Sequence, residues 1–286
     1  MNAIPLSALT NRELASTLAK MVVRALYFEV KAYPKPGLVS FIDSGAHQDM
    51  SGETFYRSIF TLRHYFYQIS LQGLETYSFD PLKQSAINAE QKMLTKTQGI
   101  NTHRGAIFAL GLFCVSAARL IKKEPVFSTQ DLHQQMLKDW SNDLSQHNPN
   151  INSHGALVRQ KSTIVDAKEI AIQGYGLIFQ LLPPFLRLFK ETQSLDISCL
   201  FAYLELLTKI DDTNVLYRKG EAGLGYAKNK AVELLAIDCL QTRHQRALEI
   251  HHLFSQEGIS PGGVADLIGV LLFLGQLFCE QLRCHY

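Results

Sequence analysis

Residues 10–26, TNRELASTLAKMVVRAL, indicate the fold class of this chain. Apolar residues recur in this stretch at steps of three and four: Leu14, Leu18, Met21, Val22, Ala25 and Leu26. That spacing places them on one face of an α-helix, and Thr10 stands where a residue can cap the first turn. The segment therefore predicts an amphipathic helix with one buried face.

The same periodicity continues along the rest of the chain. After Ser51 it involves Phe55, Ile59, Leu62, Phe66 and Ile69. Further helical windows fall at about 82–97, 104–121, 129–144, 163–181, 196–209, 224–240, 243–254 and 263–283. Alternating segments of the kind that form strands are nearly absent, so the pattern predicts an all-α protein.

Two stretches interrupt this pattern without dividing the chain into domains. Pro183-Pro184 is expected to end a helix, because proline removes a backbone donor. Residues 145–153, with Asn148-Pro149-Asn150, are expected to form a loop. Neither break has the length of a flexible linker. The sequence thus predicts one compact multi-helix domain over residues 1–286, with an active-site cleft formed by helix N-termini and glycine-rich loops.

The composition is that of a globular protein, with 47% hydrophobic and 19% charged residues. A formal net charge of +2 and the absence of any long Lys/Arg run argue against a nucleic-acid surface. The first ten residues lack the layout of a signal peptide. Residues 264–279 are apolar but short for a membrane span, and they contain Asp266 and Gln276. We expect a cytoplasmic protein without membrane segments; its oligomeric state stays open.

Four polar blocks that contain glycine stand between the apolar windows: residues 34–50, 99–106, 211–221 and 260–266. A core packs with aliphatic residues and does not need these blocks at helix starts, so we expect the chemistry there. Free N–H groups at a helix N-terminus bind anions, and Arg104 would add a bidentate phosphate contact. In the last block, Gly262-Gly263 lets a ligand approach the backbone closely.

The third block contains Asp212 and Asn214, hard oxygen donors that suit Mg²⁺, and Arg218, which suits phosphate. Taken alone, Asp212 or Asp266 is more often a helix cap than a catalyst, and a lone histidine is more often structural. The recurrence of glycine with charge at four helix starts favours function. The sequence has no P-loop, no HExxH zinc motif and no GxSxG elbow.

In this order and spacing, the four blocks resemble those of the triphosphoribosyl-dephospho-CoA synthase family. The matching segments are PKPGLV running into SGAHQDM (34–50), GINTHRGAIF (99–108), DDTN through RKGEAG (211–223) and SPGGVAD (260–266). Val39-Ser40, Asp43-Ser44-Gly45 and residues 101–112 look most like the malonate decarboxylase branch, whose sister is the citrate lyase branch.

The resemblance implies an enzyme whose substrates are ATP and 3′-dephospho-CoA. The 2′-hydroxyl of dephospho-CoA replaces adenine at C1 of the ATP ribose. The product is the precursor of a prosthetic group on a decarboxylase acyl-carrier subunit, so small nucleotides and the downstream carrier-protein enzymes are the expected partners. Such chemistry calls for a carboxylate near C1, proton carriers and Mg²⁺ with cationic side chains on the triphosphate.

On this basis we assign hypothetical roles to residues of the four blocks. The candidate catalytic residues are Asp49, Glu221, Asp266 and His103, and His47 is a further proton carrier. The candidate substrate-binding residues are Lys35, Gly37, His47, Asn101, Thr102, Arg104, Arg218, Ser260, Gly262 and Gly263. The candidate Mg²⁺ ligands are Asp212, Asn214 and Asp49.

One segment departs from the family pattern. Members usually carry Arg-x-Glu-Ala before Gly-Phe-Pro, whereas residues 168–175 here read KEIAIQGY. Two alternatives therefore stay open, a nucleotide N-glycoside hydrolase and a non-catalytic module that binds nucleotide or carrier protein. All these readings require that Lys35, Arg104, Asp212 and Asp266 gather around one cleft.

Overall fold

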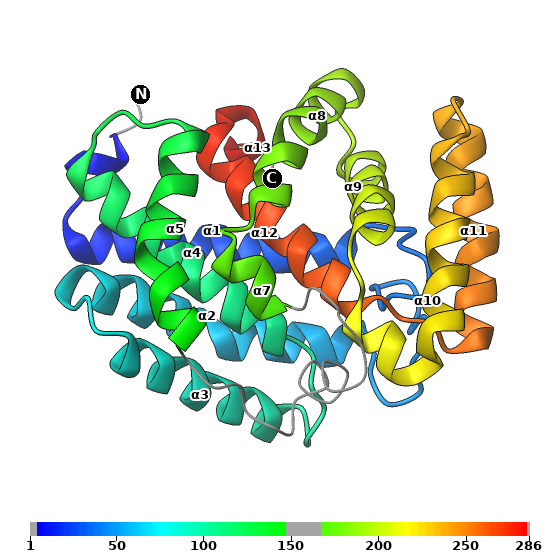
Figure 1. Ribbon diagram of the computed structural model, residues 1–286, viewed down its shortest axis with the longest axis horizontal. Coiled ribbons are helices and arrows are strands. Elements are labelled where there is room, and N and C mark those ends of the chain that lie inside the picture. Colours follow the sequence, from blue (N-terminus) through cyan, green and yellow to red (C-terminus); the bar gives the residue numbers. More distant parts are fainter. Residues whose placement is uncertain (1–4, 147–166, 285–286) are drawn as a thin grey trace.

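The computed structural model describes residues 5–146 and 167–284 (Figure 1). The regular elements in these ranges are η1 (Leu6–Ala8), α1 (Asn11–Lys31), α2 (Gly52–Glu75), α3 (Phe79–Lys96), α4 (Arg104–Lys123), α5 (Thr129–Gln146), α7 (Ala167–Ile172), α8 (Gly176–Thr192), α9 (Leu195–Lys209), α10 (Thr213–Leu235), α11 (Leu240–Glu257), α12 (Gly262–Phe278) and α13 (Glu280–Cys284). All of them are helices, so the all-α prediction is confirmed for the part of the chain described.

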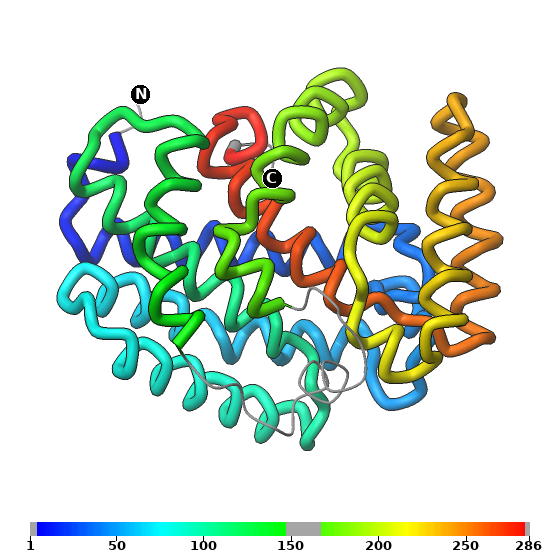
Figure 2. Tube along the Cα trace, viewed as in Figure 1, coloured from blue at the N-terminus to red at the C-terminus, as the bar shows by residue number. Residues whose placement is uncertain are grey.

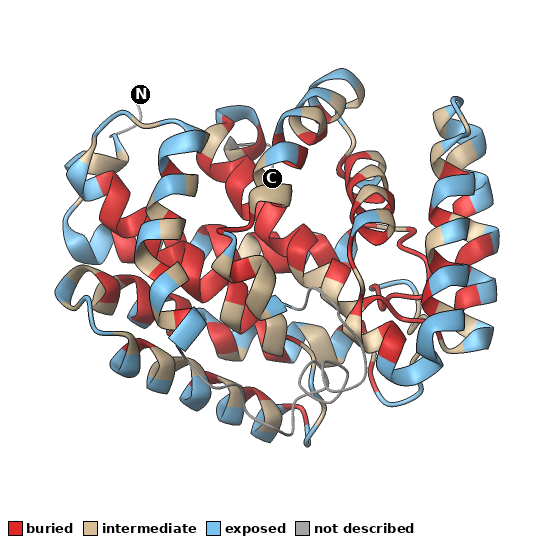
Figure 3. Cartoon of the chain, in the orientation of Figure 1, coloured by how far each residue is buried: buried red, intermediate tan, exposed pale blue. Residues whose placement is uncertain are grey.

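Helices from the two ends of the sequence form the centre of the molecule. α1 packs against α2 and α12, and α4 packs against α2 and α12 as well. The chain trace shows α1 crossing the middle beside α12, while α10 and α11 stand together at one end (Figure 2). Buried residues follow nearly the whole of α12 and the inner faces of its neighbours (Figure 3). One continuous apolar core results, with members from Leu14 to Leu282.

The start of α1 follows directly from its sequence. Thr10 Oγ1 accepts a hydrogen bond from Glu13 N at 3.3 Å, and Glu13 Oε2 accepts one from Thr10 N at 2.8 Å. This reciprocal capping box satisfies two backbone donors at the helix start. The predicted apolar stripe of this helix is buried in the core, where each side chain contributes roughly 1.5–3 kcal/mol.

The prediction that Pro183-Pro184 ends a helix is wrong, because α8 continues through both residues to Thr192. The helix loses two backbone donors there but buries Ile178, Leu181 and Leu182 before the prolines and Phe185 and Phe189 after them. Proline carries a helix-compatible φ, and burial of apolar groups on both sides offsets the missing hydrogen bonds.

The window predicted at 163–181 is not one helix. Gly174 and Tyr175 have φ of +66° and +59°, a left-handed conformation that separates α7 from α8. Of the loop predicted at 145–153, residues 145 and 146 belong instead to the last turn of α5, and residues 147–153 lie outside the described ranges, as do residues 163–166. The last window, 263–283, is divided at Cys279, and α10 begins at Thr213 rather than near residue 224.

Within the described residues, α4 is the one helix long and apolar enough to cross a membrane. Its most apolar window is 83% buried inside the protein. Burial of this extent is typical of a core helix, and α4 accordingly packs against α2, α5 and α12.

Candidate active site

A cavity of about 620 Å³ opens where α4, α10 and α12 begin and where the segment before α2 passes. Ligand pockets usually have volumes of roughly 300–1,000 Å³, so this space suits a nucleotide. The predicted residues on its wall come from all four polar blocks: His47, Asp49, Asn101, Thr102, His103, Arg104, Asn214, Arg218, Ser260, Gly262, Gly263 and Asp266. Segments far apart in the sequence therefore meet at one site.

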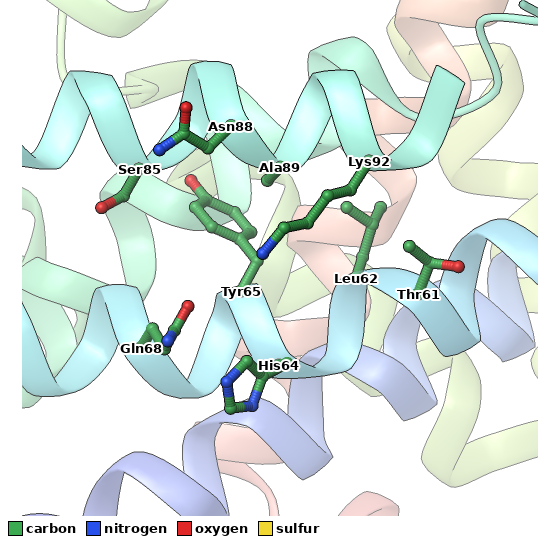
Figure 4. Close-up of a pocket in the computed structure, with 9 residues that line it drawn as sticks. All are labelled: Thr61, Leu62, His64, Tyr65, Gln68, Ser85, Asn88, Ala89 and Lys92. Carbon is green, nitrogen blue, oxygen red and sulfur yellow. The ribbon is translucent and has the colours of Figure 1, made fainter. Parts of the chain in front are cut away.

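A second pocket lies between α2 and α3 (Figure 4). Its volume is about 110 Å³, too small for a nucleotide. Ser85, Asn88 and Lys92 of α3 face Tyr65 and Gln68 of α2 across it. Because the four polar blocks contribute no side chain to this pocket, the larger cavity is the candidate active site.

Residues 33–46 form a rigid segment at the edge of the cavity. Gly37 has φ of +76°, and a Cβ there would lie 2.0 Å from Ile259 O, so no other residue fits without a shift. Its N–H donates to His251 Nδ1 at 3.2 Å, and His251 Nε2 therefore donates to Asp43 Oδ1 at 2.9 Å. Tyr203 adds a hydrogen bond from its hydroxyl to Pro36 O at 2.7 Å.

Lys35, predicted to bind phosphate, is only 1% exposed and does not line the cavity. Its ammonium donates to Ala32 O at 2.7 Å and to Glu29 O, and it lies 3.5 Å from Glu29 Oε1. Glu29 does line the cavity, and burial raises the pKa of its carboxyl. Lys35 therefore acts on the cavity only indirectly, by partly offsetting the charge of Glu29 on the wall.

Asp212, predicted as a metal ligand, is 1% exposed and joins the starts of two helices. Its Oδ1 accepts from Asn214 N at 2.9 Å and Val215 N at 3.1 Å, which caps α10. Its Oδ2 accepts from Val264 N at 3.0 Å in the first turn of α12, and Gly263 N adds a further bond. Both carboxylate oxygens are thus engaged, and the metal role stays a prediction that this geometry does not favour.

Asp266 reaches from the second turn of α12 to the start of α4. A Cβ on Gly105 would lie 2.0 Å from Asp266 Oδ2, so glycine is what lets the carboxyl sit there. The backbone N–H of Ala106 donates to it. Burial raises the pKa of Asp266 well above its usual range, and the neighbouring carboxyls of Glu29 and Asp212 raise it further. The raised pKa favours the protonated form of this side chain, which faces the cavity.

We expect Gly105→Ala to lower kcat about tenfold, because its methyl group would displace the Asp266 carboxyl. Alanine favours helix over glycine by about 1 kcal/mol, so the loss should not come from a weaker α4. Steady-state turnover and urea unfolding would measure both effects. Gly269→Ala is the matched control, since its Cβ would meet Leu26 at an ordinary 3.5 Å. Equal activity of the two variants would contradict the close approach.

His47 links three of the polar blocks. Its Nε2 lies 2.8 Å from Ser260 Oγ, and its Nδ1 lies 3.4 Å from an Arg218 nitrogen and 3.5 Å from Asp49 Oδ1. Burial lowers the pKa of His47, and the charge of Arg218 lowers it further. The imidazole is therefore neutral near pH 7 and able to accept a proton. Asp49 itself is largely exposed at the rim.

His103, a predicted catalytic residue, lies at the end of a hydrogen-bond chain. Thr102 Oγ1 donates to Ser58 Oγ at 2.8 Å, and Ser58 Oγ lies 2.7 Å from His103 Nδ1. Burial lowers the pKa of His103 to about 3, so it stays neutral and is a poor base. No group in residues 5–146 and 167–284 forms a hydrogen bond with its Nε2, so this nitrogen suits donation to a ligand.

Two further predicted residues have neighbours that the sequence did not reveal. Arg104 lines the cavity, but its guanidinium already pairs with Glu90 of α3 at 2.6 Å. Asn101 Oδ1 accepts from the backbone N–H of Arg104, the first residue of α4, at 3.1 Å. Glu221 is exposed just beyond a kink at Gly220 and does not line the cavity, so its catalytic role stays an unsupported prediction.

Whether the cavity can bind Mg²⁺ depends on the oxygen ligands that its wall offers. Among residues 5–146 and 167–284, no three His, Cys, Asp or Glu side chains are grouped to hold a metal. Mg²⁺ does not need such a cage, since one or two protein oxygens with substrate phosphates and water complete its shell. Asp49 and Asn214, both on the cavity wall, suit that mode.

The prediction that Lys35, Arg104, Asp212 and Asp266 surround one cleft is correct for two of these four residues. Arg104 and Asp266 line the cavity, whereas Lys35 and Asp212 lie behind its wall and hold residues that do line it. Lys168, at the start of the departing segment, also lines the cavity. The sequence did not single out Glu29, Ser58 or His251. Each of them is a polar residue at a position where the helical periodicity calls for an apolar one, and this pattern could have identified them.

Comparisons with known proteins identify similar chains. A probable 2-(5″-triphosphoribosyl)-3′-dephosphocoenzyme-A synthase of Acinetobacter calcoaceticus is 34% identical over 254 residues, 87% of each chain. A 2-(5″-triphosphoribosyl)-3′-dephosphocoenzyme-A synthase of Klebsiella pneumoniae is 32% identical, covering 91% of this chain and 90% of that one. Protein CitXG of Haemophilus influenzae is 31% identical over 92% of this chain and 60% of its own. No solved structure gives a significant match.

A family model described as CitG, ATP:dephospho-CoA triphosphoribosyl transferase, matches residues 15–284, nearly the whole chain. The family resemblance expected from the four polar blocks is therefore confirmed, and with it the assignment to an enzyme family. This chain belongs to the ATP:dephospho-CoA triphosphoribosyl transferase family.

Proposed function

We propose that this protein transfers the 5-triphosphoribosyl group of ATP to the 2′-hydroxyl of 3′-dephospho-CoA and releases adenine. The observation that carries the proposal is that residues of all four blocks, Asp266 among them, line the same cavity. Its volume of about 620 Å³ falls within the range of nucleotide-sized pockets.

In the proposed reaction the bond from adenine N9 to C1 of the ribose breaks and the bond from the acceptor oxygen to C1 forms. Adenine leaves more easily once protonated, so an acid must face it. Asp266 suits this role because it lines the cavity and its raised pKa favours the protonated form. Glu29 shares the wall; burial raises the pKa of its carboxyl, and the Lys35 ammonium 3.5 Å away offsets part of that rise. Once ionised, Glu29 would place a negative charge near the oxocarbenium-like centre, while Asp266 supplies the proton.

The acceptor hydroxyl must lose its proton as it attacks. Neutral His47, held against Ser260 and Arg218, is the candidate that receives it. His103 is less suited as a base, but its unpartnered Nε2 suits a hydrogen bond to substrate.

The triphosphate carries a large negative charge that the enzyme must hold throughout. We assign this task to Arg104 and Arg218, which both line the cavity. Mg²⁺, once bound between Asp49, Asn214 and the phosphates, would neutralise part of that charge. Asp212 contributes indirectly, because its hydrogen bonds hold Asn214 and the Gly262-Gly263 turn in place.

We assign the product to the prosthetic group of a malonate decarboxylase and the enzyme to the cytoplasm. The support is the likeness of residues 39–45 and 101–112 to that branch. Deleting the gene should then abolish growth on malonate, whereas a loss confined to citrate fermentation would move the protein to the sister pathway.

Adenine release tests the reaction. The purified protein should form adenine from ATP and Mg²⁺ only when dephospho-CoA is present, and mass spectrometry should detect the coupled product. Adenine formed equally well without dephospho-CoA would indicate an N-glycoside hydrolase. Saturable binding of ATP with no adenine formed would indicate a non-catalytic homologue.

A further inference from the structure

The cavity continues well beyond its charged end. Its wall follows α4 from Arg104 to Val115, a distance of roughly 16 Å at 1.5 Å per residue. It follows α3 over the same distance in the opposite direction, from Glu90 to Phe79. The Arg104–Glu90 ion pair joins the two helices at the charged end. At the other end, Phe79 lies edge-on to Trp140 of α5, with ring centroids 6.4 Å apart.

Away from the charged end, the wall becomes almost entirely apolar. Its side chains there are Phe79, Leu82, Ala86, Phe108, Leu112 and Trp140, which together define the apolar arm. Apolar surface of this length, left uncovered by residues 5–146 and 167–284, is costly to keep in contact with water because it lacks packing partners. Some ligand group of matching shape and polarity is therefore expected to fill it.

The two substrates differ in what they could place there. ATP is charged along its whole tail, which needs the helix N-termini and cations of the other end. Dephospho-CoA, in contrast, continues from its diphosphate into pantetheine, an uncharged flexible chain with methyl groups, two amides and a terminal thiol. Lys83 lines the cavity between the two ends, two helical turns from Glu90, where a diphosphate would pass.

We propose that the apolar arm binds the pantetheine chain of the acceptor and thereby selects dephospho-CoA over shorter nucleotides. The adenosine end of the acceptor then lies near Asp266 and His47, with its diphosphate beside Lys83. This inference rests on the proposed function, since it assigns the acceptor of that reaction to one part of the cavity. Binding energy from a remote, unreacting chain is a known means of orienting the reacting group.

Ala86→Trp tests the proposal by filling the arm from α3. The KM for dephospho-CoA should rise at least about tenfold while the KM for ATP stays within about twofold. Gln84→Trp is the matched control, because Gln84 is exposed on the same helix and lines neither pocket. An unchanged KM for dephospho-CoA in a folded Ala86→Trp protein would refute the proposal. A rise confined to the KM for ATP would place adenine in the arm instead.

A measurement on the unaltered protein keeps the test independent of variant folding. Pantetheine alone should inhibit competitively against dephospho-CoA and not against ATP. Absence of that competition would also refute the proposal. If the unaltered protein formed no adenine at all, the reaction itself would be refuted, which distinguishes the two failures.

Discussion

Asp266→Asn is expected to lower turnover by about 10²–10³-fold while the protein stays folded. Asparagine has the same shape and keeps a carbonyl oxygen for the Ala106 N–H, but it cannot give a proton to leaving adenine. Steady-state adenine release would measure the loss. Asp238→Asn, an exposed aspartate outside the cavity, provides the matched control. Near-normal turnover in Asp266→Asn would remove this residue from the chemistry.

The pH dependence of the same variant separates an acid from a structural residue. Because the folded-state pKa of Asp266 is raised, the folded protein binds this proton more tightly than the unfolded chain does. Its contribution to stability is therefore full below its ordinary pKa of about 3.8 and is lost as pH rises through the raised value. The Asp266→Asn variant should not show this loss of stability with rising pH, and at neutral pH it should be at least as stable as the unaltered protein. In the unaltered enzyme, kcat should fall as pH rises through the raised pKa.

Much of the fold was predictable because it rests on local patterns. The apolar stripe from Leu14 to Leu26 and the stripe after Ser51 both became buried helix faces. The polar blocks at 99–106 and 260–266 lie at the starts of α4 and α12, as their glycines and capping residues indicated. Such signals need only a few neighbouring residues. Their meeting at one cavity was expected on chemical grounds, because glycine and charged residues recur together at four helix starts.

What could not be predicted depends on partners distant in the sequence. Asp212 could be a metal ligand or a cap, and the Val264 N–H that engages its second oxygen lies 52 residues further along. From the sequence alone, Arg104 is expected to be a free cation, because its partner Glu90 belongs to a different helix, α3. The continuation of α8 through Pro183 depends on burial against other helices, which overrides the local preference of proline. Each of these outcomes is decided by tertiary packing.

Asp212→Ala is expected to lower the free energy of unfolding by about 3 kcal/mol, because several backbone N–H groups lose their acceptor in a buried site. Urea unfolding monitored by circular dichroism would measure this change. The neighbouring carboxylate supplies the control, since Asp211 makes a partly exposed ion pair with Lys228 at 2.6 Å. Such surface pairs are worth at most about 1 kcal/mol, so Asp211→Ala should change stability little.

Comparing the Asp212 and Asp211 variants distinguishes a helix cap from a metal ligand. If Asp212 joins α10 to α12, its loss should loosen the Gly262-Gly263 turn and lower both stability and turnover. If it binds Mg²⁺ directly, turnover and the Mg²⁺ requirement should change while unfolding stays the same. The saturated oxygens of Asp212 favour the first outcome, because a metal bond would leave buried N–H groups without partners. Unchanged stability in Asp212→Ala would overturn this interpretation.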